Sequence, residues 1–200
     1  MNTLERIKEE TKEVTLVAAT KYMDIDRMRY LFDSGIINFG ENRVDSFLKK
    51  KEELKDLNII WHFIGHLQKN KANKIINEIE YLHSLDSLDL AKIINDKRNT
   101  PLKCFVELHL TNSNTKNGVK EEELDHFMNE LKKFDKIDVI GFMAMSEEDS
   151  TDDEKRLVFE KAHFLSDKYN LKELSMGMSD DYKIAINCGA TFVRLGRILK

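Results

Sequence analysis

The chain alternates short apolar segments with longer segments of helical periodicity, and this alternation repeats eight times. In the helical segments apolar residues recur every three or four positions, as in Leu124, Phe127 and Leu131. The segment 104–108 is apolar at nearly every position, which is typical of parallel strands covered on both faces. The predicted strands are Val14–Thr20, Ile36–Glu41, Ile59–Gly65, Tyr81–Ser84, Leu102–Leu110, Asp138–Met145, Glu173–Met176 and Thr191–Leu195. Eight such units predict a closed (β/α)8 barrel, the TIM-barrel architecture, at the small end of its usual size.

An open, doubly wound sheet is the rival architecture, because strand order does not follow from one sequence. No Gly-x-Gly-x-x-Gly follows a predicted strand and no Gly-x-x-x-x-Gly-Lys-Ser/Thr occurs, so the two nucleotide-binding loops of open sheets are missing. The barrel is therefore favoured. The last strand runs almost to Lys200, so we expect a helix over Asn2–Lys12 to cover the remaining gap in the outer ring. With a single Pro and no Gly/Ser-rich linker, residues 1–200 are predicted to form one domain.

The composition argues against several classes of partner. Thirty-two Lys and Arg against 36 Asp and Glu give a net charge of −4, so the chain lacks the positive charge that non-specific nucleic-acid binding needs. Met1–Val14 is broken by charges, unlike a secretory signal, and no apolar run approaches the roughly 18 residues of a membrane helix. Cys104 and Cys188 are expected to be unpaired core thiols, because a chain of this size needs no disulfide. We expect a cytoplasmic protein without nucleic-acid or membrane partners.

Lys21 ends an apolar strand, and in a barrel the carboxyl ends of the strands carry the working residues. By strand alternation its side chain shares a face with Val17 and Ala19 and points towards the barrel mouth. Partial burial at that place lowers the pKa of an amine and prepares it to condense with an aldehyde. A strand-end lysine that extends into water fits the same pattern. This residue alone leaves both interpretations open.

The segment Ser175–Asp180 joins a predicted strand to a helix expected over Asp180–Cys188. Its hydroxyls and free amides lie at the positive end of the helix dipole, where they can bind an anion. Gly196, after the last predicted strand, lets a second backbone segment approach the same anion. The two loops therefore form a predicted phosphate cradle, at the place where barrels commonly hold phosphate. In a simpler interpretation Ser179 is only the N-cap of the helix and the glycines only form turns. This interpretation is compatible with the phosphate cradle.

Arg194 lies inside the last predicted strand, on the same face as Gly196. A buried guanidinium needs an acceptor partner. A carboxylate of the barrel or a ring nitrogen of a ligand could serve, and the residues themselves do not choose between them.

Several motifs carry a resemblance that covers nearly the whole chain. Residues Trp61–Ile75 match a family signature throughout, and shorter matches follow the expected order at Phe39–Asn42, His83–Asp86, Leu174–Ser179 and Val193–Gly196. On these motifs the chain resembles the pyridoxal 5′-phosphate homeostasis proteins, stand-alone barrels similar to the N-terminal domain of bacterial alanine racemase. The resemblance implies a pyridoxal-phosphate-binding barrel of fold type III.

The resemblance also implies a set of contacts to the cofactor. Lys21 holds pyridoxal 5′-phosphate covalently as an aldimine, Asn42 and Met178 flank its pyridine ring, and Arg194 faces the ring nitrogen, while Ser175 and the Gly196 region hold the phosphate. Arg197 stands where the family leads us to expect Thr, so a hydroxyl contact to phosphate is lost or replaced by a cation. The complete set of predicted cofactor-binding residues is Lys21, Asn42, His66, His83, Ser175, Gly177, Met178, Arg194, Gly196 and Arg197.

Two classes of enzyme share parts of this pattern. An amino-acid racemase needs a second base on the opposite face of the substrate carbon, which alanine racemases take from a separate β domain for which this chain has no length. Tyr22 and Tyr30 lie close to Lys21 in the sequence, but we expect them to be packing residues. A class I aldolase also uses a Schiff-base lysine and a phosphate loop, and only the signature over Trp61–Ile75 separates the two.

Two further interpretations are disfavoured. His62 and His66 are four residues apart, but Phe63 stands where a zinc protease needs Glu and the pair falls across a strand end. Core or hydrogen-bonding histidines are expected instead, and no metal site is predicted. The basic residues of the next segment are interpreted as the solvated face of a helix rather than a nucleic-acid site: Lys69, Lys71 and Lys74.

Together these observations predict a monomeric or weakly dimeric cytoplasmic barrel. It binds pyridoxal 5′-phosphate through Lys21, takes part in the homeostasis of this cofactor, and has pyridoxal-phosphate-dependent apo-enzymes as candidate recipients. No catalytic turnover of its own is predicted, because a cation at the ring nitrogen makes the cofactor a weaker electron sink.

Overall fold

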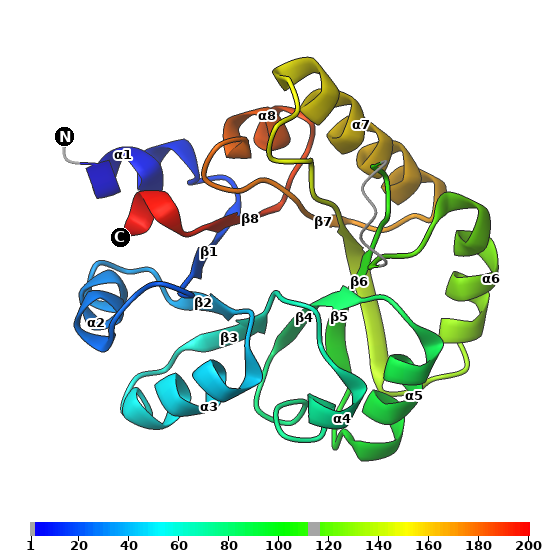
Figure 1. Cartoon of the computed structure of the whole chain (residues 1–200), viewed down its shortest axis with the longest axis horizontal. Coiled ribbons are helices and arrows are strands. Elements are labelled where there is room, and N and C mark those ends of the chain that lie inside the picture. Colours follow the sequence, from blue (N-terminus) through cyan, green and yellow to red (C-terminus); the bar gives the residue numbers. More distant parts are fainter. Residues whose placement is uncertain (1–2, 112–116) are drawn as a thin grey trace.

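Eight parallel strands form a closed barrel in the order β1 to β8 (Figure 1). The computed structural model describes residues 3–111 and 117–200. The strands are β1 (Thr15–Ala19), β2 (Asn38–Glu41), β3 (Ile60–Phe63), β4 (Tyr81–Leu85), β5 (Leu102–Glu107), β6 (Ile137–Met143), β7 (Glu173–Ser175) and β8 (Phe192–Leu195). The helices are α1 (Thr3–Glu10), α2 (Ile25–Asp33), α3 (Val44–Glu53), α4 (Lys69–Ala72), α5 (Leu88–Lys97), α6 (Glu121–Leu131), α7 (Asp152–Lys168), α8 (Tyr182–Asn187) and the 3-10 helix η1 (Arg197–Leu199). The prediction of a (β/α)8 barrel is confirmed.

Local sequence signals set the starts of several helices. The Asp24 side chain accepts a hydrogen bond from the Arg27 amide (2.8 Å) at the start of α2. Thr151 and Glu154 form a reciprocal capping box at the start of α7, where each side chain bonds to the other residue's backbone amide. These caps begin the helices directly after the loops at the barrel mouth.

The strand ends differ from the sequence-based prediction most clearly in β5, which ends at Glu107 rather than Leu110. Beyond Glu107 the chain leaves the main ladder and pairs with Val119, whose amide donates to the Glu107 carbonyl (2.8 Å). The helix expected over Asp180–Cys188 is also shorter and begins at Tyr182. In β5 the alternating apolar residues Leu108 and Leu110 continue past the end of the strand, so this pattern does not mark where the backbone changes partner.

The outer ring lacks a full helix after β8, and α1 with η1 fills that position. The Tyr182 hydroxyl of α8 donates to the Glu10 carboxylate of α1, and Lys8 of α1 donates to the Ser34 carbonyl that follows α2 (2.6 Å). The Leu199 carbonyl of η1 accepts from Arg27 (2.8 Å). The expectation that the N-terminal helix covers this gap is therefore confirmed for its described residues, and Asn2 lies outside them (Figure 1).

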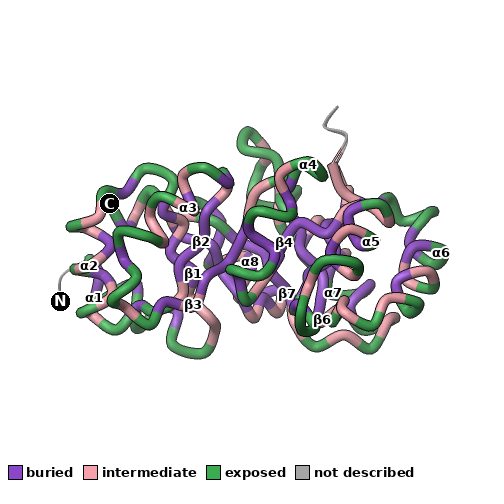
Figure 2. The backbone as a smooth tube through the Cα atoms, turned by 90° about the horizontal axis from the view of Figure 1, so that it is seen from below, coloured by how far each residue is buried: buried purple, intermediate pink, exposed green. Residues whose placement is uncertain are grey.

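The core has two parts, one between the strands and the helices and one inside the barrel. The inner cluster consists of Val17, Phe105, Met143 and Phe192. Figure 2 shows the buried backbone concentrated in the strands and the exposed backbone at the rims. Both cysteines are buried and unpaired, as predicted. None of the helices in the described part of the chain is long and apolar enough to cross a membrane.

A buried ion pair fixes the backbone directly before Lys21. The fully buried Glu41 carboxylate, at the end of β2, accepts hydrogen bonds from Lys50 of α3 (2.5 Å) and from the Thr20 hydroxyl (2.8 Å). Lys50 also donates to the Thr20 carbonyl (2.5 Å). The ends of β1 and β2 are thereby tied to α3.

We expect Lys50→Met to destabilise the protein by about 3–5 kcal/mol, because it leaves the buried Glu41 carboxylate without its cation. Lys49→Met is the matched control, since Lys49 is 78% exposed and its nearest acidic partner is 3.8 Å away. Its expected cost is under about 0.5 kcal/mol. Urea unfolding measures both, and equal midpoints for the two variants would contradict the role of the pair.

Candidate functional site

Two adjoining cavities open at the carboxyl ends of the strands, and together they form the mouth of the barrel. Their volumes are about 440 Å³ and 290 Å³, which is the range of small-molecule sites. Both cavities are lined by Ala19, Lys21, Met178 and Arg194. The sequence-predicted residues Arg197 and Gly196 line the larger cavity, and Asn42 and His66 line the smaller one.

Strand register brings Lys21 beside the other predicted site residues. Ala19 pairs with Gly40 of β2, so Lys21 and Asn42 lie at the same level beyond the strand ends. On the other side Val17 pairs with Arg194 of β8. Lys21 is exposed rather than partly buried, because the chain leaves the sheet at Thr20 and turns.

Tyr22 also lines the larger cavity, which the sequence analysis did not anticipate. Its ring centroid is 4.7 Å from the Lys21 ammonium, and this cation lowers the pKa of the Tyr22 phenol. Tyr22 is 64% exposed and Tyr30 is 50% exposed, so the expectation that both are packing residues is wrong. They stack against cations instead, Tyr30 against Arg27.

Asn42 carries a buried acceptor that has no hydrogen-bond partner within the described ranges, its side-chain oxygen Oδ1. An unpaired buried acceptor is costly unless a ligand or water meets it. The end of β3 approaches Asn42 closely, and a Cβ atom on Gly65 would lie 2.4 Å from the Asn42 carbonyl oxygen. Glycine at position 65 is therefore required for this wall of the smaller cavity.

The loop after β7 is held in place by Asp181. Gly177 has a φ of +95°, a conformation that favours glycine, and a Cβ there would lie 2.7 Å from the Cβ of Ala185. The buried Asp181 carboxylate accepts from the Met178 amide (2.6 Å) and from the Ser146 hydroxyl (2.6 Å). This network presents residues 178–181 to the larger cavity.

Ser179 bridges the last two loops. Its hydroxyl oxygen accepts a hydrogen bond from the Gly196 amide (3.3 Å). It is not the N-cap of α8, because that helix begins at Tyr182 and Asp181 occupies the cap position. The exposed Arg197 forms an ion pair with Asp180, so part of its charge is already balanced within the loop.

Arg194 is buried at the base of the mouth. Its guanidinium donates to the Ser175 carbonyl (2.8 Å), the Ser175 hydroxyl (2.5 Å) and the Ala144 carbonyl (3.4 Å). Burial lowers the pKa of Arg194 to about 10, against the opposing effect of Glu107 and Asp181. The side chain therefore stays charged at neutral pH, and protein oxygens supply the acceptors that its burial requires.

A chain of buried polar side chains runs from Arg194 through the barrel. The Ser175 hydroxyl is 2.7 Å from His83 Nδ1, His83 Nε2 is 2.9 Å from His62 Nδ1, and His62 Nε2 is 3.0 Å from the Asn38 side-chain oxygen. The Asn38 oxygen only accepts, so His62 Nε2 donates to it, His83 Nε2 donates to His62, and the Ser175 hydroxyl donates to His83. Both imidazoles are then neutral.

The electrostatics agree with neutral imidazoles. Burial lowers the pKa of His62 to about 3 and lowers the pKa of His83 well below its ordinary range, with Arg194 contributing at His83. Ser175 and His83 thus lie beneath the mouth and support Arg194, rather than lining the cavities. His62 is a hydrogen-bonded core histidine, as expected, whereas His66 is exposed at the mouth and bonds to Asp86 (3.1 Å).

Glu107 is the main site residue that sequence reasoning missed. It ends β5, is 5% exposed and lines the smaller cavity. Burial, with a further contribution from Asp86, raises the pKa of Glu107 to about 7, against the opposing effect of Arg194. An acidic residue at the end of an apolar strand was the available signal, and it has the same pattern as Lys21.

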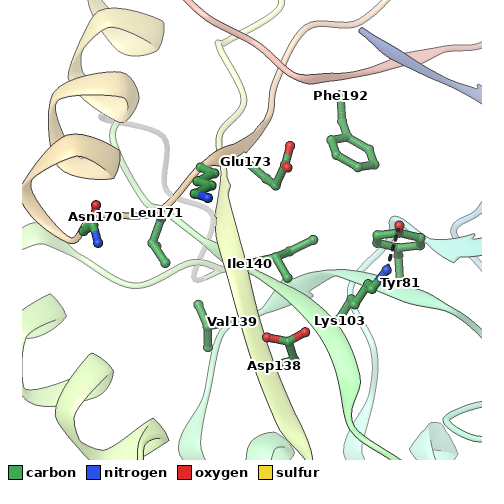
Figure 3. Close-up of a pocket in the computed structure, with 10 residues that line it drawn as sticks. Tyr81, Lys103, Asp138, Val139, Ile140, Asn170, Leu171, Glu173 and Phe192 are labelled. Atoms are coloured by element: carbon green, nitrogen blue, oxygen red, sulfur yellow. Dashed lines mark hydrogen bonds between the residues drawn. The ribbon is translucent and has the colours of Figure 1, made fainter.

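A third cavity, of about 340 Å³, lies at the opposite, amino-terminal end of the barrel (Figure 3). Figure 3 shows Ile140, Glu173 and Phe192 around it, with Lys103 donating to the Tyr81 hydroxyl (3.4 Å). We place the functional site at the mouth, because two buried groups with perturbed pKa values, Glu107 and Arg194, line it together with Lys21. Within residues 3–111 and 117–200, no three His, Cys, Asp or Glu side chains are grouped to hold a metal ion.

Comparisons with known proteins agree with this geometry. The family model described as "Alanine racemase, N-terminal domain" matches residues 2–199. A relative in Aquifex aeolicus (strain VF5), named pyridoxal phosphate homeostasis protein, is 37% identical over 193 residues, covering 92% of this chain and 85% of that protein.

Solved structures give the same result. PipY of Synechococcus elongatus PCC7942, solved with PLP bound, superposes with a TM-score of 0.90 at 30% identity and covers 99% of both chains. Alanine racemase of Corynebacterium glutamicum has a TM-score of 0.76 at 16% identity and covers 98% of this chain but 59% of that chain. The second likeness concerns the fold alone.

The two buried imidazoles predict a loss of stability in acid. His62 takes up its proton at about pH 3 in the folded protein and at its ordinary value of 6.5 when unfolded. The unfolded chain therefore binds more protons as the pH falls from 6.5 towards 3, and the free energy of unfolding decreases across this window. The slope is up to about 1.4 kcal/mol per pH unit for each imidazole.

Urea unfolding between pH 7 and pH 4 measures this slope, and we expect His62→Gln to reduce it. The exposed His126 provides the control variant His126→Gln. Its stability is expected to change with pH by the same slope as that of the natural protein. The assignment of a neutral, buried His62 fails if all three proteins lose stability in parallel.

Proposed function

Because this chain belongs to the alanine racemase N-terminal domain family, we propose that it binds pyridoxal 5′-phosphate at the barrel mouth and takes part in the homeostasis of this cofactor. The observation that carries the proposal is the convergence of Lys21, Arg194 and the loop over residues 177–181 on one pair of cavities. The structure of PipY with PLP bound supports this proposal, because the match covers nearly all of both chains.

The residues at the mouth fit such a cofactor. Asn42 Oδ1 is an acceptor that lacks a partner in the described part of the chain, and it can meet a donor on a ligand. Ser179 brings a hydroxyl to the larger cavity, and because its oxygen accepts from the Gly196 amide, its hydrogen remains to be donated to a phosphate. An amine, a cavity lined by Met178 and polar groups for an anion are the features that this ligand needs.

Lys21 is the covalent attachment point in this proposal. Its ε-nitrogen forms a C=N bond with the aldehyde carbon of the cofactor, and the aldehyde oxygen leaves as water. The Glu41–Lys50 pair holds Thr20, so the backbone in front of Lys21 is fixed while its side chain extends into the mouth. Exposure of Lys21 leaves this amine accessible to an incoming cofactor.

The remaining contacts follow from the positions of the side chains. Asn42 and Met178 are proposed to flank the ring from the two sides of the mouth, and Arg194 to face the ring nitrogen from below. Ser175 and His83 contribute by holding the Arg194 guanidinium. The phosphate is assigned to the loop that contains Gly177 and Ser179 and to the end of β8, including Gly196 and Arg197.

The same arrangement supports holding the cofactor rather than turnover. When bound, pyridoxal phosphate supplies an electrophilic carbon and a ring that withdraws electrons. A guanidinium that stays charged beneath the ring disfavours protonation of the ring nitrogen and weakens that electron withdrawal. We therefore propose a single-domain cytoplasmic protein, monomeric or weakly dimeric, that passes the cofactor to pyridoxal-phosphate-dependent apo-enzymes.

We expect the purified protein with added pyridoxal phosphate to be yellow, and borohydride to add the mass of the reduced cofactor to the peptide containing Lys21. Lys21→Ala is expected to abolish both signals. Lys155→Ala is the matched control, because Lys155 lines the same cavity and is expected to leave the adduct in place. Absorbance and peptide mass spectrometry are the measurements, and an unchanged adduct in Lys21→Ala would refute the assignment.

One observation favours a second candidate function, an amino-acid racemase. Tyr22 lines the mouth beside Lys21, and the lowered pKa of its phenol suits a proton-transferring group. However, Tyr22 follows Lys21 directly in the chain and contacts its ammonium, whereas a two-base racemase needs its bases on opposite faces of the substrate carbon.

Incubation with L-alanine or L-serine, followed by chiral chromatography, tests this alternative. No steady formation of the D-enantiomer is expected, because Lys21 and Tyr22 approach from the same side. Continuous conversion that is lost in both Lys21→Ala and Tyr22→Phe would establish the racemase and overturn the absence of turnover.

A further inference from the structure

Glu107 is a buried carboxyl group that opens onto the smaller cavity of the mouth. No hydrogen bond or ion pair joins its side chain to any residue in the described ranges. Buried carboxylates are normally paired, since an unpaired charge in a poorly solvated site is costly. A group kept in this state inside a ligand cavity points to a role that involves the ligand.

The charges around Glu107 act in opposite directions. Asp86, after β4, disfavours the charged carboxylate, and Arg194 of β8 favours it. The other titratable groups that line the same cavity are Lys21, after β1, and His66, after β3, and His66 is bonded to Asp86. From β6 the residue at the same level is the uncharged Met143, which pairs with Glu107 in the strand register.

We propose that Glu107 couples the filling of the mouth to the uptake of a proton. Its carboxyl group takes a proton from solvent when an anionic phosphate ester of an aromatic aldehyde enters the cavity, and it returns that proton when the cavity empties. The inference rests on the proposed function and concerns a residue that the family motifs in the sequence do not include.

Two physical effects produce this coupling. The ligand displaces water from a cavity of about 290 Å³ and thereby removes the remaining solvation of the carboxylate. The negative charges of the phosphate and of the ring hydroxyl then act in the same direction as Asp86. In the empty protein the pKa of Glu107 is about 7, so near neutral pH both charge states are present and the bound ligand shifts the balance.

The variant Glu107→Gln, with a neutral side chain of the same shape, therefore distinguishes proton uptake by Glu107 from proton uptake by the cofactor or by other residues. In Glu107→Gln the side chain cannot take up a proton, while the titrations of the cofactor and of the other mouth residues are unchanged in kind. We expect the dissociation constant for pyridoxal phosphate of the natural protein, relative to that of Glu107→Gln, to rise by up to about tenfold between pH 6 and pH 8.

Isothermal titration calorimetry in buffers of different ionisation enthalpy gives a second, direct readout. At pH 8 the natural protein is expected to take up about one proton more per bound cofactor than Glu107→Gln. Cofactor binding by both proteins with the same pH dependence and the same proton uptake would overturn the role of Glu107 and leave the proposed function intact. If neither protein binds the cofactor, the proposed function fails as well.

Two measurements keep the proposal testable if Glu107→Gln does not fold. Asp86→Asn removes the nearby negative charge, so the fall in affinity is expected to begin at a lower pH than in the natural protein, and an unchanged pH dependence would count against the proposal. In infrared difference spectra of the natural protein at pH 8, cofactor binding is expected to increase the protonated-carboxyl band. Its absence would contradict the proton uptake.

Discussion

The pairing of β1 with β8 is the interaction on which the rest of the structure depends. It closes the barrel with Val17 opposite Arg194, and it thereby places the first strand of the sequence beside the last. The residue that follows β1, Lys21, and the residue that follows β8, Gly196, come to the same cavity only because of this closure. In an open sheet the two would lie at opposite edges, and the amine of Lys21 would be far from the proposed phosphate-binding loops. Packing of α1 and η1 over this seam protects it from solvent.

The barrel interior combines two requirements that compete elsewhere in proteins. Its centre must be filled densely, and Val17, Phe105, Met143 and Phe192 do this. It must also hold a charged guanidinium at the base of the mouth, which needs oxygen and nitrogen partners in a dry environment. The chain from Ser175 through His83 and His62 to Asn38 satisfies the second requirement without introducing another charge. His83 packs against Phe105 with ring centroids 4.5 Å apart, so it helps to fill the barrel centre and also belongs to the hydrogen-bonded chain that supports Arg194.

Much of this architecture was predictable from periodicity and strand ends. The eight strands, the covering role of the N-terminal helix and the position of Lys21, Arg194 and Gly196 at one mouth follow from alternation and from the rule that strand carboxyl ends carry function, whereas Asn42 was expected there from the family resemblance. The hydrogen-bonded chain was not predictable, because it depends on which inward side chains share a level in neighbouring strands, and register is a tertiary property. The helix expected over Asp180–Cys188 starts later than predicted for a related reason, because the Asp181 carboxylate binds the Met178 amide of the loop and α8 begins only at Tyr182. Glu107 escaped notice because the predicted strand ran on to Leu110, which placed this acid inside the strand rather than at its end.

The chain of Asn38, His62, His83 and Ser175 has a direction, and this has an evolutionary consequence. Each imidazole carries one hydrogen, and each hydrogen is already committed to a neighbour, so no member can be exchanged without changing what the next one must offer. A replacement that offers a donor where an acceptor stood leaves two hydrogens facing each other in a place that water does not reach. These four positions should therefore vary among relatives as a correlated block rather than one at a time, and descendants that abandon the pattern should replace it wholesale with apolar side chains.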